Sequence, residues 1–147
     1  MTDAAATDIL LVEDNPGDVI LFSEAVEAAK MTANVHVVGD GLAAMRYLRR
    51  EGDYVGMPRP DVVVLDLDLP LKSGHEVLAE LRAEPAMTGT PVAVFTTSGS
   101  EAAICKGYTD GLCRFFTKTG DFGKLRHIVK QIEEFAIAVR YSRPKNP

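Results

Sequence analysis

Five short runs of apolar, mostly β-branched residues divide the chain at regular intervals, and helical patterns separate them. Most of the runs are continuously apolar, which is typical of strands covered on both faces of a sheet. They are Asp8 to Val12, Asn34 to Val38, Asp61 to Asp66, Pro91 to Thr96 and Cys113 to Thr117. Because parallel strands need long crossover connections, this alternation predicts an open parallel sheet with helices on both faces.

The segments between these runs place apolar residues three and four positions apart, as amphipathic helices do. We expect helices at Gly17 to Lys30, Gly41 to Arg50, Gly74 to Glu84, Ser100 to Thr109 and Phe122 to Tyr141. Five such units predict an α/β fold of the flavodoxin-like, doubly wound (βα)5 kind, with strand order 2-1-3-4-5. We expect a single domain over residues 1–147, with its core at about 8–135 and a helix extension and tail at about 136–147.

The composition excludes several classes of protein. With 46% hydrophobic and 25% charged residues, the chain is globular rather than disordered. It has no apolar run of the roughly 18 residues that a membrane span needs, and its start lacks the order of a signal peptide, so we expect a cytoplasmic protein without membrane contact. The net charge of −5 argues against nucleic-acid binding, and we interpret the basic group Arg140, Arg143 and Lys145 as solvated.

The cysteines and histidines form no recognisable metal motif. Cys105 and Cys113 stand eight positions apart, and we expect them to be reduced thiols rather than a disulfide framework or a zinc site. His36, His75 and His127 are far apart in the sequence, which argues against an imidazole metal site.

Acidic residues follow two of the predicted strands directly. Glu13 and Asp14 follow the first, and Asp66 ends the third in the stretch "VVVLDLDLPLKSG". Ligand sites in such sheets lie at the carboxyl ends of the strands, so these acids are expected to converge. Crowded carboxylates repel one another unless a positive group lies among them, and oxygen ligands of this kind suit Mg²⁺.

The spacing of further residues carries a family resemblance. Pro70 and Gly74 follow Asp66, and Thr96 and Lys118 lie 30 and 52 positions beyond it. With the acidic pair upstream, this set resembles the two-component response-regulator receiver domain over about Ile9 to Phe135. The stretches "VEDNPGD" and "PRPDVVVLDLDLP" and the extended last helix resemble the free-standing receivers that serve bacterial phytochromes.

The resemblance implies a phosphoacceptor signalling protein rather than an enzyme. Asp66 would accept a phosphoryl group from a histidine of a sensor kinase, of phytochrome type by the narrower likeness. Mg²⁺, or Mn²⁺, would be held by Asp14, Asp66 and the main-chain carbonyl of Asp68, with Glu13 acting through water. At most, the chain would phosphorylate itself from small donors and dephosphorylate itself.

The resemblance also implies how the site would contact the phosphoryl group and signal its presence. Lys118 would pair with the phosphoryl oxygens, and Thr96 would donate its hydroxyl to one of them. As Thr96 moves, Phe115 would turn inward as the switch aromatic and change the face of the molecule beside the last strand. Core packing alone is the other interpretation of Phe115.

Two positions depart from the family pattern. Asp68 is acidic where many receivers carry Asn, and we expect it to affect metal dependence and self-hydrolysis, although simple solvation of this side chain is an equal alternative. Thr119 replaces the proline usual after Lys118, so we expect a trans bond between the two, because a cis bond costs about 2.5–4 kcal/mol without proline.

Two other functions are compatible with the sequence. A haloacid-dehalogenase-type phosphatase also has an Asp-x-Asp motif after a strand, but it lacks an acidic pair upstream. A receiver-like scaffold that is not phosphorylated is the other alternative. We also expect a homodimer through the apolar residues Phe135, Ile137, Val139 and Tyr141, unless these pack within the chain.

Overall fold

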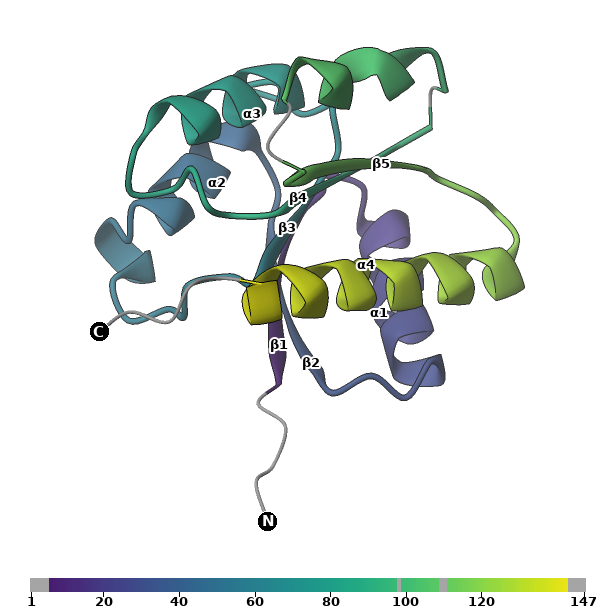
Figure 1. Ribbon diagram of the computed structural model, residues 1–147. Helices are drawn as coiled ribbons and strands as arrows, with labels where there is room; N and C mark the ends of the chain where they lie inside the picture. Colours follow the sequence, from purple (N-terminus) through teal and green to yellow (C-terminus); the bar gives the residue numbers. More distant parts are fainter. Residues whose placement is uncertain (1–5, 98, 109–110, 143–147) are drawn as a thin grey trace.

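The computed structural model describes residues 6–97, 99–108 and 111–142, and its strands form one parallel sheet (Figure 1). The sheet has five strands in the order β2-β1-β3-β4-β5. They are β1 (Thr7–Val12), β2 (Ala33–Val38), β3 (Val62–Leu65), β4 (Val92–Thr96) and β5 (Cys113–Thr117). All pairings are parallel, which confirms the predicted α/β class and strand order.

Helices cover both faces of this sheet. They are α1 (Pro16–Ala28), α2 (Gly41–Leu48), α3 (Gly74–Ala83) and α4 (Phe122–Ser142), with short 3₁₀ segments η1 (Gly52–Tyr54) and η2 (Gly99–Gly107). Apolar side chains of α1 and α4 pack in one core with one face of the sheet, and those of α2 and α3 pack in a second core with the other. α1 and α4 are in contact, and Figure 1 shows them on the same side of the sheet.

Local sequence sets where two of the helices begin. The side chain of Asn15 accepts hydrogen bonds from the backbone N–H groups of Gly17 and Asp18, and Pro16 occupies the first turn of α1. At α3, Ser73 and Glu76 form a reciprocal capping box. These caps fix the loops that lead out of β1 and β3, where the acidic residues lie.

The segment predicted as a helix from Ser100 to Thr109 differs from that expectation. It is a nine-residue 3₁₀ segment, η2, and Thr109 lies outside the described residues. A glycine bounds it at each end, and a helix of this length is marginal without strong tertiary packing. Ile104 and Cys105 are only partly buried against the core, so packing holds the segment weakly.

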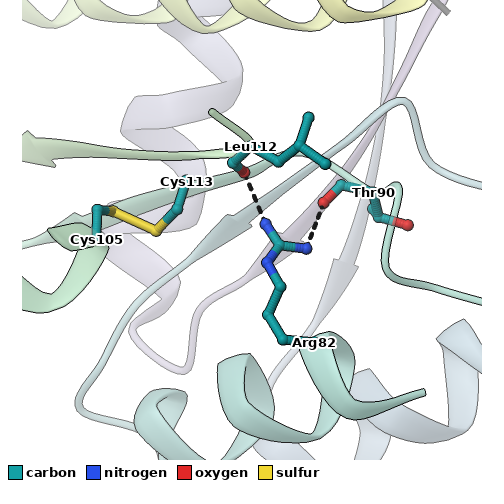
Figure 2. The surroundings of a disulfide bond; sticks show 5 residues. All are labelled: Arg82, Thr90, Cys105, Leu112 and Cys113. Carbon is teal, nitrogen blue, oxygen red and sulfur yellow. Dashed lines mark hydrogen bonds between the residues drawn. A yellow bond between two sulfur atoms is a disulfide. The ribbon is translucent and has the colours of Figure 1, made fainter. Parts of the chain in front are cut away.

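The expectation of reduced, separate thiols is wrong. Cys105 of η2 and Cys113 of β5 form a disulfide, with their Cα atoms 5.3 Å apart, and neither cysteine is free (Figure 2). Their separation in sequence gave no sign of this contact. The bond forms because η2 packs beside β5 in the folded chain.

The end of α4 packs partly within the chain. Phe135 is buried in the core, and Val139 packs against the same core, whereas Tyr141 is 80% exposed. The basic group near the C-terminus was expected to be solvated. Arg140 instead pairs with Asp61, its Nη1 lying 3.6 Å from Asp61 Oδ2. Residues 143 and 145 of this group fall outside the described part of the chain. Among the described residues, no helix has the length and apolar character needed to cross a membrane.

Candidate functional site

The carboxyl ends of β1 and β3 bring the predicted acids to one edge of the sheet. Val12 is paired with Leu65 in the ladder, so the residues that follow, Glu13 and Asp66, leave the two strands side by side. The backbone N–H of Asp66 donates to the carbonyl of Val12 at 3.2 Å, which extends the ladder to the acid itself. The register of two buried strands therefore positions both carboxylates.

Three carboxylates meet at this edge. Glu13 is 4% exposed and Asp66 is 6% exposed, whereas Asp14 is open to solvent. One oxygen from each lies within 4.8 Å of the others, so a single cation could contact all three. A hard divalent cation fits this set of oxygen ligands, two of them buried and one facing water.

Lys118 enters the same cluster from the end of β5. Its Nζ lies 2.5 Å from Glu13 Oε1 and 3.0 Å from Asp66 Oδ2, and its side chain is 11% exposed. A third carboxylate, that of Asp18 on α1, accepts from Nζ at 2.8 Å. The backbone N–H of Lys118 donates to the Thr96 carbonyl at 2.8 Å, which holds this residue in register with β4.

The peptide bond between Lys118 and Thr119 is trans, as expected. The described residues include no cis peptide bond, so the bond from Lys118 to Thr119 is trans. The lysine still reaches the acids in this conformation, and the missing proline therefore leaves its contacts intact.

Burial and hydrogen bonding act against each other in this cluster. Burial raises the pKa of Glu13, and the hydrogen bond from Lys118 opposes that rise. Burial alone would lower the pKa of Lys118, but its hydrogen bonds to Asp18, Glu13 and Asp66 raise that pKa well above its usual value. Lys118 is therefore fully charged at neutral pH and compensates the buried carboxylates.

The loop from β3 to α3 wraps closely around Asp66. The backbone N–H of Asp68 donates to Asp66 Oδ1 at 3.1 Å, while the Asp68 side chain is exposed. Gly74 donates to the carbonyl of Leu67 at 3.0 Å, and a Cβ at Gly74 would overlap the carbonyl oxygen of Asp66. Glycine is required at this position because the backbones approach too closely for a side chain.

The two predicted switch residues lie at neighbouring strands. Thr96, at the end of β4, is 1% exposed, and it is paired with Thr117 of β5. Phe115 is partly buried and packs against the core that α2 and α3 share with the sheet. Phe115 therefore lies on the face of the sheet against which η2 packs.

The sequence interpretation did not include Asp18. It lies in the first turn of α1, where an acidic residue is common simply because it favours the helix N-terminus. The stretch "VEDNPGD" contains it, but its contact with Lys118 depends on how α1 packs against the sheet. Among the other predicted site residues, Glu13, Asp14, Asp66, Thr96 and Lys118 lie at or just after strand ends, whereas Asp68 lies in the loop after β3 and Phe115 within β5.

Comparison with known proteins identifies the family. The family model described as "Response regulator receiver domain" matches residues 9–130. The chain belongs to this family. The response regulator Rcp1 of Synechocystis sp. is 39% identical to this receiver domain over 127 residues, which cover 86% of each chain.

Solved structures of similar receivers agree with the fold. The phosphorylated cyanobacterial phytochrome response regulator RcpA is 43% identical, with a TM-score of 0.78, over 90% of this chain and 95% of that one. The Mn²⁺-bound form of Rcp1 is 34% identical, with a TM-score of 0.75, over 96% and 99% of the two chains. Receivers bind a divalent cation in such an acidic site and take phosphoryl groups from sensor histidine kinases. These relatives give the phosphatase alternative no support.

Proposed function

We propose that Asp66 is the phosphoacceptor of this receiver. One of its carboxylate oxygens attacks the phosphorus of a phosphohistidine, the P–N bond breaks, and its electron pair stays on the imidazole. The observation that carries the proposal is the contact of Asp66 Oδ2 with Lys118 Nζ at 3.0 Å inside an acidic cluster that fits a cation. Transfer of this kind depends on positioning and charge neutralisation more than on covalent chemistry.

The acids would hold the metal in defined roles. Asp14 and Asp66 would be direct carboxylate ligands, Glu13 would act through water, and the main-chain carbonyl of Asp68 would complete the set. When bound, Mg²⁺ or Mn²⁺ would neutralise charge on the phosphoryl oxygens. The mixture of buried and exposed carboxylates supports this arrangement, because the exposed side leaves room for water and phosphoryl oxygens.

Lys118 and Thr96 would bind the transferred group. The Lys118 ammonium is already fixed beside the acceptor and needs to exchange carboxylate partners for phosphoryl oxygens. Thr96 would donate its hydroxyl to one of those oxygens, and Phe115 would move into the space that Thr96 vacates. Moving a tenfold excess of the inactive form to a tenfold excess of the active form takes about 2.7 kcal/mol, within the usual range for coupling between sites.

The partner we propose is a sensor histidine kinase of the phytochrome type. Support comes from RcpA, which is described as a cyanobacterial phytochrome response regulator and shares 43% identity with this chain. We place the chain in the cytoplasm as one receiver domain over residues 1–147. Its output would be a contact with another protein or onward phosphoryl transfer.

One measurement tests the phosphoacceptor. The full chain is incubated with Mg²⁺ and acetyl phosphate, and its intact mass is recorded. We expect one added phosphoryl group, lost in Asp66→Asn and kept in the matched control Asp53→Asn, whose residue is exposed on η1. No added mass in the wild-type chain would favour the scaffold alternative. Addition at an unchanged level in Asp66→Asn would show that the acceptor is another residue.

We also propose that the chain forms a homodimer through the end of α4. Because Phe135 and Val139 pack within the chain, Tyr141 and the partly exposed Ile137 are the apolar groups left to contact a second copy. Sedimentation equilibrium of the wild-type chain is expected to show a dimer that Tyr141→Glu weakens. A monomer at all concentrations would contradict this proposal without affecting the phosphoacceptor.

A further inference from the structure

The disulfide lies on the face of the receiver that the switch residue reaches. Cys105 belongs to η2, and Cys113 is the first residue of β5, two positions before Phe115 (Figure 2). Successive side chains of a strand alternate between its faces, so Cys113 and Phe115 lie on the same one. Both, together with Cys105 and Ile104, pack against the core shared by α2, α3 and the sheet.

The bond joins a segment of unusual geometry to a regular strand. η2 runs for nine residues in 3₁₀ form, whereas most such helices are only three or four residues long because their hydrogen-bond geometry is poorer. Its noncovalent anchors to the rest of the molecule include the pair between Glu101 and His75 of α3, at 2.9 Å. The covalent link to β5 therefore restrains a segment whose core-packed side chains, Ile104 and Cys105, are only partly buried.

Noncovalent contacts of Arg82 on α3 also hold the two cysteine-bearing segments close together, independently of the disulfide. Its guanidinium donates to the carbonyl of Leu112 at 2.8 Å and to that of Thr90 at 2.9 Å (Figure 2). It also lies 5.8 Å from the ring centroid of Tyr108, three positions after Cys105. These contacts do not involve the sulfur atoms, so reduction would leave the thiols near each other and able to pair again.

We propose that Cys105 and Cys113 form a reversible dithiol–disulfide couple that sets how far phosphorylation can move η2 against β5. In the oxidised form the bond holds η2 on the core beside Phe115, and in the reduced form η2 is free to follow that side chain. This inference rests on the proposed function, because the movement it limits is the response to phosphorylation of Asp66.

The chemistry of the couple is an exchange with a small-molecule disulfide such as oxidised glutathione. One protein thiolate attacks that disulfide, giving a mixed disulfide and one released thiol. The second protein thiolate then attacks the protein sulfur and releases the second thiol. Two electrons and two protons pass from the cysteines to the small molecule. Both cysteines are partly exposed, which gives the reagent access.

The coupling between the redox state of the cysteines and phosphorylation of Asp66 has to act in both directions. If the disulfide favours the unphosphorylated arrangement of η2, phosphorylation must favour reduction by the same factor. We expect this factor to be about fivefold or more, the lower end of measured couplings between sites.

The test compares oxidised and reduced full-length chain by hydrogen exchange and mass spectrometry, with and without Mg²⁺ and acetyl phosphate. Alkylation first counts the thiols, and two are expected to appear only after treatment with dithiothreitol. In reduced chain, phosphorylation should change the exchange rate of peptides spanning 99–107 by about fivefold or more, and oxidised chain should show a clearly smaller change. A bond that resists dithiothreitol under native conditions, or equal changes in the two forms, overturns the proposal.

The double variant Cys105→Ser/Cys113→Ser provides the control. It should behave as reduced chain whether or not dithiothreitol is present, which separates loss of the bond from other effects of the reagent. Intact mass recorded on the same samples distinguishes failure of the proposed function from failure of the redox couple. If no form gains a phosphoryl group, the proposed function fails; if all gain it and respond alike, only the redox couple fails.

Discussion

Asp18 accepts a hydrogen bond from Lys118 at 2.8 Å, although 100 positions separate them in the sequence. This contact joins the first turn of α1 to the end of β5, and it makes Asp18 the third carboxylate around one ammonium group. Asp18 is the most exposed of the three, with 36% of its side chain accessible. It is therefore the partner that Lys118 can release most easily when a phosphoryl group arrives.

We predict that Asp18→Asn has a small effect on stability. An ion pair with one partner this exposed contributes up to about 1 kcal/mol, so the free energy of unfolding should fall by no more than that. Phosphoryl uptake should persist, because Glu13 and Asp66 still hold Lys118. Urea unfolding and intact mass measure the two effects. Loss of uptake in this variant would instead give Asp18 a direct role at the site.

Replacing the lysine should have a much larger effect. Lys118→Met leaves Glu13 and Asp66 buried without their cation, and breaking a buried pair from one side costs about 3–5 kcal/mol. Urea unfolding without divalent ions should show this loss. Lys124→Met, which removes an exposed cation on α4 away from the cluster, should change stability little.

The same variant tests the link between Lys118 and the metal. Without the ammonium group, the carboxylates should bind Mg²⁺ more tightly, because a competing positive charge is gone. Mg²⁺ should therefore stabilise Lys118→Met more than it stabilises the wild-type chain in thermal unfolding. Equal stabilisation of the two chains would contradict the idea that lysine and metal compensate the same carboxylates.

Asp68 is acidic where many receivers carry Asn, and replacing it tests whether its carboxylate affects the site. Its backbone already contributes to the site by donating to Asp66 Oδ1 at 3.1 Å, and this bond does not depend on the side chain. We expect Asp68→Asn to keep phosphoryl uptake, to weaken Mg²⁺ binding and to change the rate of self-dephosphorylation. Titration with Mg²⁺ and the decay of the phosphorylated mass measure these effects. If neither quantity changes, the side chain is only solvated.

The sequence predicts the sheet and most of the site for a common physical reason. Buried strands need continuous apolar runs, and parallel strands bring their carboxyl ends to one edge, so Glu13, Asp66 and Lys118 could be placed together without coordinates. The contact of Asp18 and the pairing of the cysteines could not be predicted this way. They depend on how α1 packs on the sheet and on the path of the chain between η2 and β5, which hydrophobic patterns do not encode.

Because Gly74 lies so close to the backbone of Asp66, adding a single methyl group at Gly74 should lower the free energy of unfolding. A Cβ at Gly74 would overlap the Asp66 carbonyl oxygen and the Leu67 Cα, both of them backbone atoms that cannot turn aside. We expect Gly74→Ala to lower the free energy of unfolding by about 1–3 kcal/mol, as overpacking does. At Gly56 a Cβ would meet no atom within 4 Å, so Gly56→Ala is the matched control and should be nearly neutral.

The ion pairs of Glu80 on α3 should make the free energy of unfolding depend on pH. Its carboxylate pairs with Lys72 and with Arg49, which connects α3 to the preceding loop and to the end of α2. The hydrogen bond from Lys72 is the main cause of a lowered pKa at Glu80, which the Arg49 contact reinforces and burial opposes. A carboxyl group whose pKa is lower in the folded chain than in the unfolded chain stabilises the folded chain at pH values above the unfolded pKa. This stabilisation is lost as the pH falls through the pKa of the folded chain.

Glu80→Gln should therefore be less stable than wild type at pH 7 by up to about 1 kcal/mol, since about a third of the side chain is exposed and solvent screens the pairs. The difference should shrink as the pH falls below about 4, where the wild-type carboxyl takes up its proton. Urea unfolding of both chains at several pH values measures it. Glu51→Gln, a change at an exposed glutamate outside this group, controls for loss of charge alone. A difference that stays constant with pH would mean that Glu80 acts through packing rather than through its charge.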